Sequence, residues 1–455
     1  MELLRPGARS RLPLAALALL AIFAMLLLSL GGLARADWLA PDATYREALV
    51  QLRYTTRDTA GHGDDPARLD SLGAALLRVG RVADARKLFE RVMTLKPGDA
   101  GASAGLGKLA LWADRLSEAE SLLTAAGDEP EVIADLYATK LRRGDWAGAA
   151  TLCEVVGDEG RKSLLEHQAE AEPVRVTGER ASVAFQRVWP APLVRVKLNG
   201  TTVLMLLDTG TPGVFVDKLA ATQQKVTLLP GQRVAVWGGT RVAVRNATVN
   251  RLEIGDVVLE RVPAGVLSLH KFSLEVNPQS EEIAGVIGLD VLRRFDVVMD
   301  FSKRRLELVP LGTARAEGAT KVPFESWGEG EITVWGSMQG GRRMAMMLSS
   351  GLIAAGVGAP SVVFEELGLK PGSLSKAMHG AGAWFGGTAW APVTVPSLSL
   401  GALAFDKLPG WSGAMDPSEL WRHGVRRDAV LGPGLLLKRR VTIDWTRRQL
   451  LFEEN

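Results

Sequence analysis

Hydrophobic positions in the first third of the chain recur with helical spacing, and the pattern repeats. Between about residues 66 and 158, small and apolar residues return every 34 residues, from 72 to 106, from 85 to 119 and from 89 to 123. The matched positions are Leu72-Gly73 and Leu106-Gly107, Ala85 and Ala119, and Phe89 and Leu123. A looser third copy puts Ala149 and Cys153 in the places of Ala85 and Phe89. The pattern predicts stacked pairs of helices.

These repeats resemble tetratricopeptide units, in which a small residue stands where two helices cross, an apolar residue follows one turn later, and a proline such as Pro97 ends the unit. The resemblance implies a helical domain over residues 37–160 with a surface that recruits a protein partner or substrate. Cys153 falls at a core position of the pattern, so we expect its thiol to be buried and unreactive.

The pattern changes after a polar segment at residues 161–179, which we interpret as a linker. From about residue 180, short β-branched runs such as Leu193–Gly200 ("LVRVKLNG") are separated by glycines and turn residues. Such runs predict short strands. The expected fold class is therefore multidomain, an α-helical repeat region followed by an all-β region.

The β region is itself doubled. The segment at 285–308 aligns with the segment at 429–452, 144 residues further on. The aligned pairs are Gly288 and Gly432, Asp300 and Asp444, and Leu306 and Leu450. We predict two homologous lobes, at residues 180–312 and 320–455. Asp300 and Asp444 recur at strand ends beside aromatic and basic residues, which favours a turn or ion-pair role for both.

The N-terminus carries a targeting pattern. Arg5, Arg9 and Arg11 precede an apolar run from about residue 12 to 30, and small residues follow at Ala34 and Ala36. This layout is typical of a secretory signal peptide, residues 1–36, cleaved after Ala36. The apolar run approaches membrane-spanning length, so a retained membrane anchor is the alternative. In both cases we expect an exported chain, in the periplasm or cell envelope.

Composition narrows the function classes. The chain of 455 residues is 47% hydrophobic and 23% charged with a formal net charge of +3, so the sequence gives little support for nucleic-acid binding. One cysteine and five histidines without metal-ligand spacing argue against a metal centre, and no phosphate-binding glycine loop is present. We therefore expect no cofactor and no metal.

Two short segments carry candidate chemistry at matched places in the lobes. Asp208-Thr209-Gly210 follows an apolar run in the first lobe, and Ser349-Ser350-Gly351 follows an apolar run in the second. Further along each lobe, Trp237-Gly238-Gly239 matches Phe385-Gly386-Gly387 as the tip of a hairpin. The second lobe keeps the hydroxyl residue and the glycine of the first motif and lacks only the acid.

Together with "GVIGLDVLRRFDVVMDFSKRRL", these motifs resemble the retropepsin-like aspartic peptidases, over more than half of the chain. The resemblance implies two β-barrel lobes that each supply one loop to a shared site, where two aspartates share a proton and activate water. It implies that Asp208 is catalytic, that Thr209 hydrogen-bonds to the partner loop, and that Gly210 allows a tight turn. The hairpins at Trp237–Gly239 and Phe385–Gly387 would cover an extended polypeptide substrate.

The missing acid leaves three accounts open. Two chains could form a homodimer in which Asp208 meets its own copy. The two lobes of one chain could pair, so that Asp208 works with Ser349 and water. In the third account the protein is an inactive pseudo-peptidase that binds peptides as an envelope adaptor. The complete motif at Asp208 favours the aspartic endopeptidase over the adaptor.

Overall fold

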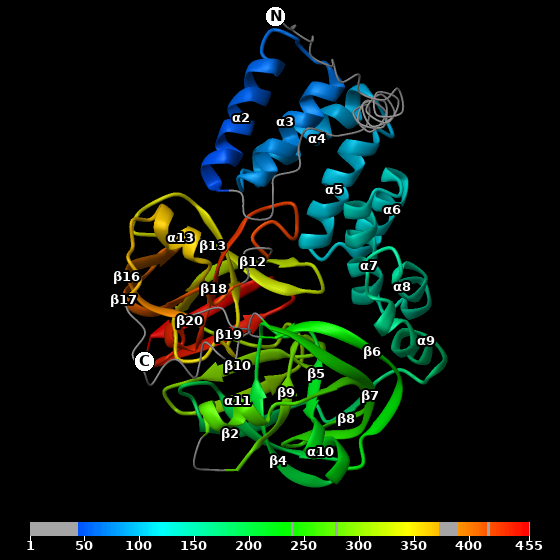
Figure 1. Ribbon diagram of the computed structural model, residues 1–455, viewed down its shortest axis with the longest axis vertical. Coiled ribbons are helices and arrows are strands. Elements are labelled where there is room, and N and C mark those ends of the chain that lie inside the picture. Colours follow the sequence, from blue (N-terminus) through cyan, green and yellow to red (C-terminus); the bar gives the residue numbers. More distant parts are fainter. Residues whose placement is uncertain (1–43, 238–239, 278–280, 373–389, 416–418, 455) are drawn as a thin grey trace, which may run out of the picture. The chain divides into compact units, whose positions relative to one another are not determined.

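The computed structural model describes residues 44–237, 240–277, 281–372, 390–415 and 419–454. Its helical N-terminal part and β-rich remainder confirm the predicted α plus all-β architecture (Figure 1). Residues Pro41–Asn455 form one compact unit. The predicted signal peptide or anchor at residues 1–36 lies outside the described residues. Among the described helices, none is long and apolar enough to cross a bilayer.

Consecutive helices pack against one another through the first part of the chain (Figure 1). They are α2 (Tyr45–Thr59), α3 (Pro66–Arg78), α4 (Val82–Leu95), α5 (Ala100–Trp112), α6 (Leu116–Ala126), α7 (Pro130–Arg143), α8 (Trp146–Leu152), the 3-10 helix η1 (Glu159–Arg161) and α9 (Lys162–Glu170). The start of α3 shows how the sequence sets a boundary, because the Asp65 side chain accepts from two backbone N–H groups and Pro66 occupies the first turn.

The 34-residue period corresponds to a repeated contact. A Cβ atom on Gly73 would lie 2.7 Å from the Phe89 ring, and a Cβ atom on Gly107 would lie 2.8 Å from the Leu123 side chain. Each glycine thus lets one helix approach the apolar residue of the next, at equivalent places in two repeats. Cys153, at the corresponding place in the third copy, is fully buried, and burial raises the pKa of its thiol.

The segment expected to be a linker is partly helical, which corrects the prediction for residues 161–179. Helix α9 occupies its first half and buries Leu164 and Leu165. Leu165 packs in one cluster with Tyr137 and Cys153 of the preceding helices. The polar composition of the segment concealed this pair of leucines, whose burial stabilises an extra helix beyond the repeats.

The β region contains two similar sets of strands. The first set is β1 (Arg175–Thr177), β2 (Ala181–Arg187), β3 (Leu193–Leu198), β4 (Thr201–Leu207), β5 (Val214–Asp217), β6 (Thr227–Trp237), β7 (Thr240–Ile254), β8 (Val257–Leu267), β9 (Ile283–Ile287), β10 (Asp296–Asp300) and β11 (Arg305–Val309), with helices α10 (Lys218–Gln223), α11 (His270–Val276) and α12 (Leu289–Leu292). The second set is β12 (Thr320–Trp327), β13 (Glu331–Met338), β14 (Met344–Leu348), β15 (Val357–Ala359), β16 (Ala391–Leu400), β17 (Leu403–Ser412), β18 (Arg427–Leu431), β19 (Arg439–Asp444) and β20 (Gln449–Glu454), with α13 (Ser361–Glu366) and the 3-10 helix η4 (Pro433–Leu435). We call the two sets lobe 1 and lobe 2.

The two lobes share one pattern of strand pairing. In lobe 1, β4 is parallel to β9, while β5 is parallel to β8 and antiparallel to β9. In lobe 2, β14 is parallel to β18, while β15 is parallel to β17 and antiparallel to β18. The duplication inferred from the sequence is therefore a duplication of topology.

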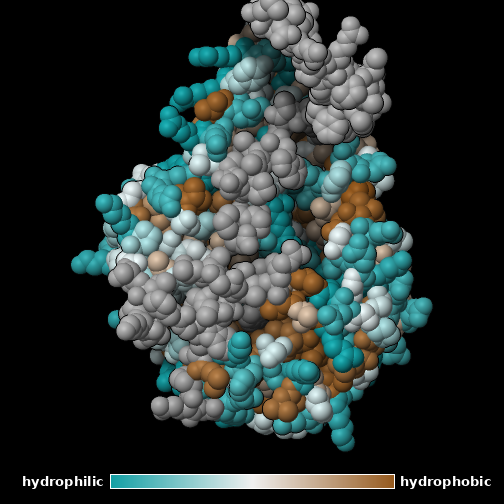
Figure 2. Space-filling view, viewed as in Figure 1, coloured by the Kyte–Doolittle hydropathy of each residue, from teal (hydrophilic) through white to brown (hydrophobic). Residues whose placement is uncertain are grey.

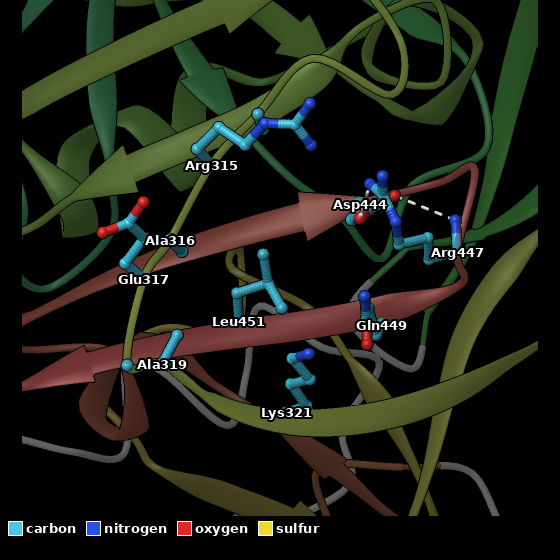
Figure 3. Close-up of a pocket in the computed structure, with 11 residues that line it drawn as sticks. Arg315, Ala316, Glu317, Ala319, Lys321, Asp444, Arg447, Gln449 and Leu451 are labelled. Carbon is cyan, nitrogen blue, oxygen red and sulfur yellow. Dashed lines mark hydrogen bonds and ion pairs between the residues drawn. The ribbon is translucent and has the colours of Figure 1, made fainter.

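One antiparallel sheet joins the lobes, in the strand order β2, β11, β10, β19, β20, β12. Its central pair is β10 and β19, where Val297 pairs with Ile443. A pocket of about 330 Å³ lies between this sheet and the residues that connect the lobes, with Asp444 bonded to Arg447 beside it (Figure 3). Because its lining includes none of the predicted site residues, the pocket lies apart from the candidate site.

The helical repeats pack against lobe 2 and share a hydrophobic core with it. Trp112 of α5 stacks on Trp327 of β12 with ring centroids 4.5 Å apart, and both side chains are about 1% exposed or less. At the end of α7, Arg142 donates to the carbonyl of Ser326 at 2.9 Å. These contacts fix the repeats to lobe 2 through buried surface, so part of the helical surface is already occupied within the chain.

Candidate active site

Two equivalent loops meet where the lobes face each other. In lobe 1, β4 leads into Asp208, whose N–H donates to the carbonyl of Ile287 on β9 at 3.0 Å. In lobe 2, β14 leads into Ser349, whose N–H donates to the carbonyl of Leu431 on β18 at 2.8 Å. Because each loop leaves a buried strand that has the same parallel neighbour, Asp208 and Ser349 hold equivalent positions.

Reciprocal hydrogen bonds lock the loops together. The N–H of Thr209 donates to Ser350 Oγ at 3.1 Å, and the N–H of Ser350 donates to Thr209 Oγ1 at 3.0 Å. The two hydroxyls then donate across the interface, Thr209 to the carbonyl of Leu348 at 3.2 Å and Ser350 to that of Leu207 at 2.8 Å. All four bonds are buried, so neither loop can move alone without leaving buried polar groups unpaired. The lobes of one chain are thus paired through the hydroxyl residues of both motifs.

The carboxylate of Asp208 accepts four hydrogen bonds. Its Oδ1 atom accepts from the N–H of Gly210 at 2.8 Å, from Ser349 Oγ at 2.9 Å and from the N–H of Gly351 at 3.0 Å. Its Oδ2 atom accepts from Thr211 Oγ1 at 2.6 Å. The side chain is 7% exposed. Both carboxylate oxygens are therefore held in place, Oδ1 by groups of both loops and Oδ2 by Thr211.

Glycine is required in both loops because they approach so closely. A Cβ atom on Gly210 would lie 2.4 Å from Ser349, and a Cβ atom on Gly351 would lie 2.5 Å from the carboxylate carbon of Asp208. Neither position has room for a side chain, since the nearest atoms belong to groups fixed by hydrogen bonds. The approach also lets both glycine N–H groups reach the carboxylate.

Thr211 is a site residue that the motif analysis did not single out. Its hydroxyl orients the outer oxygen of Asp208, and it is itself buried. The equivalent position in lobe 2 is Leu352, which has no hydroxyl. A comparison of the residues that follow the two glycines would have revealed this difference. Lobe 2 therefore lacks both the acid and the hydroxyl that would orient it.

The hairpin predicted to cover the substrate is formed by β6 and β7. Trp237 ends β6 and pairs with Thr240 at the start of β7. The tip residues Gly238 and Gly239 lie outside the described residues, as does the matching segment Phe385-Gly386-Gly387 of lobe 2. The structure therefore places the lobe 1 hairpin up to its last strand pair and leaves the other predicted hairpin tip untested.

The end of the helical region holds the base of this hairpin. Asn246 of β7 is fully buried and donates to the carbonyl of Gly160 at 2.8 Å and to Ser163 Oγ at 3.1 Å. The Ser163 hydroxyl donates to the carbonyl of Pro230, in the irregular stretch of β6. A Cβ atom on Gly160 would lie 2.1 Å from the carbonyl oxygen of Gln232. Helical segment and hairpin are therefore in contact through their backbones.

The two strand-end aspartates have local structural roles. Asp300 accepts from the N–H of Lys303 and from the hydroxyl of Ser302, both at 2.8 Å. Asp444 accepts from the N–H of Arg447 at 2.8 Å and pairs with its guanidinium at 2.9 Å. Each carboxylate closes a turn, as the sequence predicted. No group of three or more metal-ligating side chains occurs in the described part of the chain.

Comparison with known families follows this division of the chain. A family model described as aspartyl protease matches residues 194–291, and one described as tetratricopeptide repeat matches residues 76–129. The first range includes the Asp208 loop and ends before lobe 2, which is linked to it by the repeated topology. A search of curated proteins finds no match.

Proposed function

We propose that this chain, which contains an aspartyl protease domain and a tetratricopeptide repeat region, hydrolyses peptide bonds of extended polypeptides with Asp208 as its only catalytic carboxylate. The observation that carries the proposal is the pairing of Asp208 with Ser349 at 2.9 Å, across two loops that are otherwise equivalent. A carboxylate beside a hydroxyl that can turn to the substrate can act as a general base on water.

Asp208 and Ser349 would together take the roles that two aspartates have in a paired site. Asp208 takes a proton from a water molecule, whose oxygen attacks the peptide carbonyl carbon. The Ser349 hydroxyl turns from Asp208 to donate a hydrogen bond to the carbonyl oxygen, where negative charge develops. Asp208 then passes its proton to the leaving nitrogen. A hydroxyl is a weaker acid than a protonated carboxyl, so we expect slower hydrolysis than a paired site would support.

The changes in lobe 2 favour a second candidate, a peptide-binding adaptor without hydrolysis. Ser349 replaces the acid and Leu352 replaces the orienting hydroxyl, while the bonds between Thr209 and Ser350 are kept. That combination maintains the shape of the site and removes part of its chemistry. A homodimer through two copies of Asp208 is less favoured, because it would first break the buried bonds between the loops.

The decisive experiment compares the wild-type exported chain with Asp208→Asn, using an unfolded protein substrate between pH 3 and 8. We expect cleavage by the wild type and at least a hundredfold loss in Asp208→Asn, because an amide cannot accept the proton. Asp300→Asn is a matched control, since this carboxylate only closes a turn. Equal cleavage by wild type and Asp208→Asn would exclude Asp208 as the base. Tight peptide binding without cleavage by the wild type would favour the adaptor.

Location and partner complete the proposal. The basic and apolar N-terminal pattern supports export to the periplasm or cell envelope, by a cleaved signal or a retained anchor. The repeats support recruitment of a protein partner or substrate, as is general for this repeat class. Such a partner would use helical surface away from Trp112 and Arg142, which contact lobe 2.

A further inference from the structure

A half-buried arginine lies on the inner face of the hairpin. Arg233 of β6 lies over the ring of Phe215, with its guanidinium carbon 5.7 Å from the ring centroid. The next residue, Val234, is 58% exposed, and Ala235 turns inward again to the hydrophobic cluster that contains Phe215. Because side chains alternate along a strand, Arg233 and Ala235 share the face of the hairpin that looks toward Phe215.

That face is turned toward the candidate site. Phe215 lies on β5, which directly follows the Asp208 loop, and it is 4% exposed. Ile353, two residues beyond Gly351 in the other loop, packs against the same cluster. Phe215 and Ile353, which follow the two loops, therefore pack in one cluster with the inner face of the hairpin, and Arg233 lies over Phe215 next to this cluster.

The nearby acids are already paired with another arginine. Arg161 of η1 donates from Nη1 to both carboxylate oxygens of Glu329, at 2.9 Å each, and lies 3.9 Å from Asp158. Asp158 also accepts from the hydroxyl of Tyr137 at 2.9 Å. These contacts engage Glu329 and Asp158 at the place where the helical region, the hairpin and lobe 2 come together.

Arg233 shares its neighbouring carboxylates with Arg161, because the charges of Glu329 and Asp158 act on both arginines. Among the described residues, no carboxylate oxygen lies within 4.0 Å of its guanidinium, and its Nε is buried without a hydrogen-bond partner. Burial and the neighbouring charge of Arg161 lower the pKa of Arg233 more than the charges of Glu329 and Asp158 raise it. A half-buried guanidinium whose Nε has no hydrogen-bond partner costs free energy, which a carboxylate bound to its terminal nitrogens would offset.

We propose that Arg233 is a specificity-determining residue that binds a carboxylate of the polypeptide, either the C-terminal carboxylate or an Asp or Glu side chain. The planar guanidinium fork matches a carboxylate, and carboxylates are the anions that an unmodified polypeptide can supply. The segment at Gly160–Ser163 bonds to the base of the hairpin and lies against the backbone of Arg233. The inference rests on the proposed peptide-binding site.

The test measures peptide binding in the full chain carrying Asp208→Asn, by fluorescence anisotropy. One labelled heptapeptide is used with a free C-terminal carboxylate, with a C-terminal amide, and as the amide with a central Gln replaced by Glu. We expect at least one carboxylate peptide to bind about tenfold tighter than the neutral one, since hydrogen bonds to a charged partner contribute this much or more. The C-terminal and Gln-to-Glu comparisons distinguish the two sources.

Arg233→Gln should abolish this preference and leave the affinity for the neutral amide unchanged, whereas Arg233→Lys should keep part of it. Arg245→Gln is the matched control, because Arg245 is exposed on β7 of the same hairpin. Equal binding of all three peptides to the Asp208→Asn chain would overturn the proposal, and so would no binding of any peptide or an equal loss in Arg245→Gln. Cleavage by the wild type is measured separately, so binding with a carboxylate preference but without cleavage would refute hydrolysis alone.

Discussion

Restoring an acid at Ser349 is the sharpest test of how the two loops work together. In Ser349→Asp, the new carboxylate would take the place of a hydroxyl that now lies 2.9 Å from Asp208 Oδ1. The loop has room for this side chain. Asp208 packs against Gly351, and the new carboxylate at position 349 would pack against Gly210 in the same way, since both glycines lack a side chain. The perturbation therefore changes charge more than packing.

The magnitude follows from the separation of the two groups. Two unit charges about 4 Å apart repel by about 4 kcal/mol at an effective dielectric constant near 20. That cost is enough to keep one proton on the pair over a wide pH range, which is the state that an aspartic mechanism needs. We expect hydrolysis of an unfolded protein to rise about tenfold or more at acid pH, with a bell-shaped pH profile and inhibition by pepstatin.

The assay measures initial rates between pH 3 and 8 for the wild type, Ser349→Asp and the neutral control Ser349→Asn. Thermal unfolding at the same pH values checks that each variant is folded. Ser349→Asp should unfold at a lower temperature at pH 7 than at pH 4, because both carboxylates are forced to ionise as the pH rises. A folded Ser349→Asp that is no faster than Ser349→Asn at any pH would show that the two loops do not form a shared acid site.

Three further predictions concern the parts that surround the site. Asn246→Ala removes the bonds to the helical segment, so amide hydrogen exchange in β6 and β7 should accelerate about tenfold. Arg245→Ala, at an exposed position of β7, should leave the exchange unchanged. Equal exchange in both variants would show that the helical contact does not hold the hairpin. Trp327→Ala leaves a cavity in the core shared by the helices and lobe 2, so it should lower the free energy of unfolding by about 3–5 kcal/mol in denaturant titrations. A loss under about 1 kcal/mol would contradict that role of Trp327. Burial lowers the pKa of His423 more than Glu331 raises it, so the unfolded chain takes up this proton below about pH 6.5 while the folded chain resists it. Stability should therefore fall between pH 7 and pH 5.5, by at most about 1.4 kcal/mol per pH unit, and His423→Gln should remove that component from thermal melts; an unchanged pH dependence would count against it.

Local periodicity explains why much of the fold could be predicted. The 34-residue spacing of Gly73 and Gly107 reflects one contact made twice, and the offset between Asp300 and Asp444 reflects one turn made twice. Such repeats are visible in the sequence because equivalent positions in each copy make the same contact and carry similar residues. The polar segment at 161–179 shows the limit, since its helix depends on burying Leu165 against residues that lie earlier in the chain.

The candidate site divides in the same way. That one loop has an acid and the other a serine could be read from the residues alone, because the apolar strand, hydroxyl residue and glycine mark equivalent positions in both lobes. That Asp208 faces Ser349 of the same chain, 141 residues away, and that Thr211 holds the outer oxygen became known from the folded arrangement. It also brought Asn246 and Arg233 to the end of the helical region. The physical reason is that hydrogen bonds and charge pairs depend on distances of a few ångströms between side chains, and those distances are fixed by how whole elements pack.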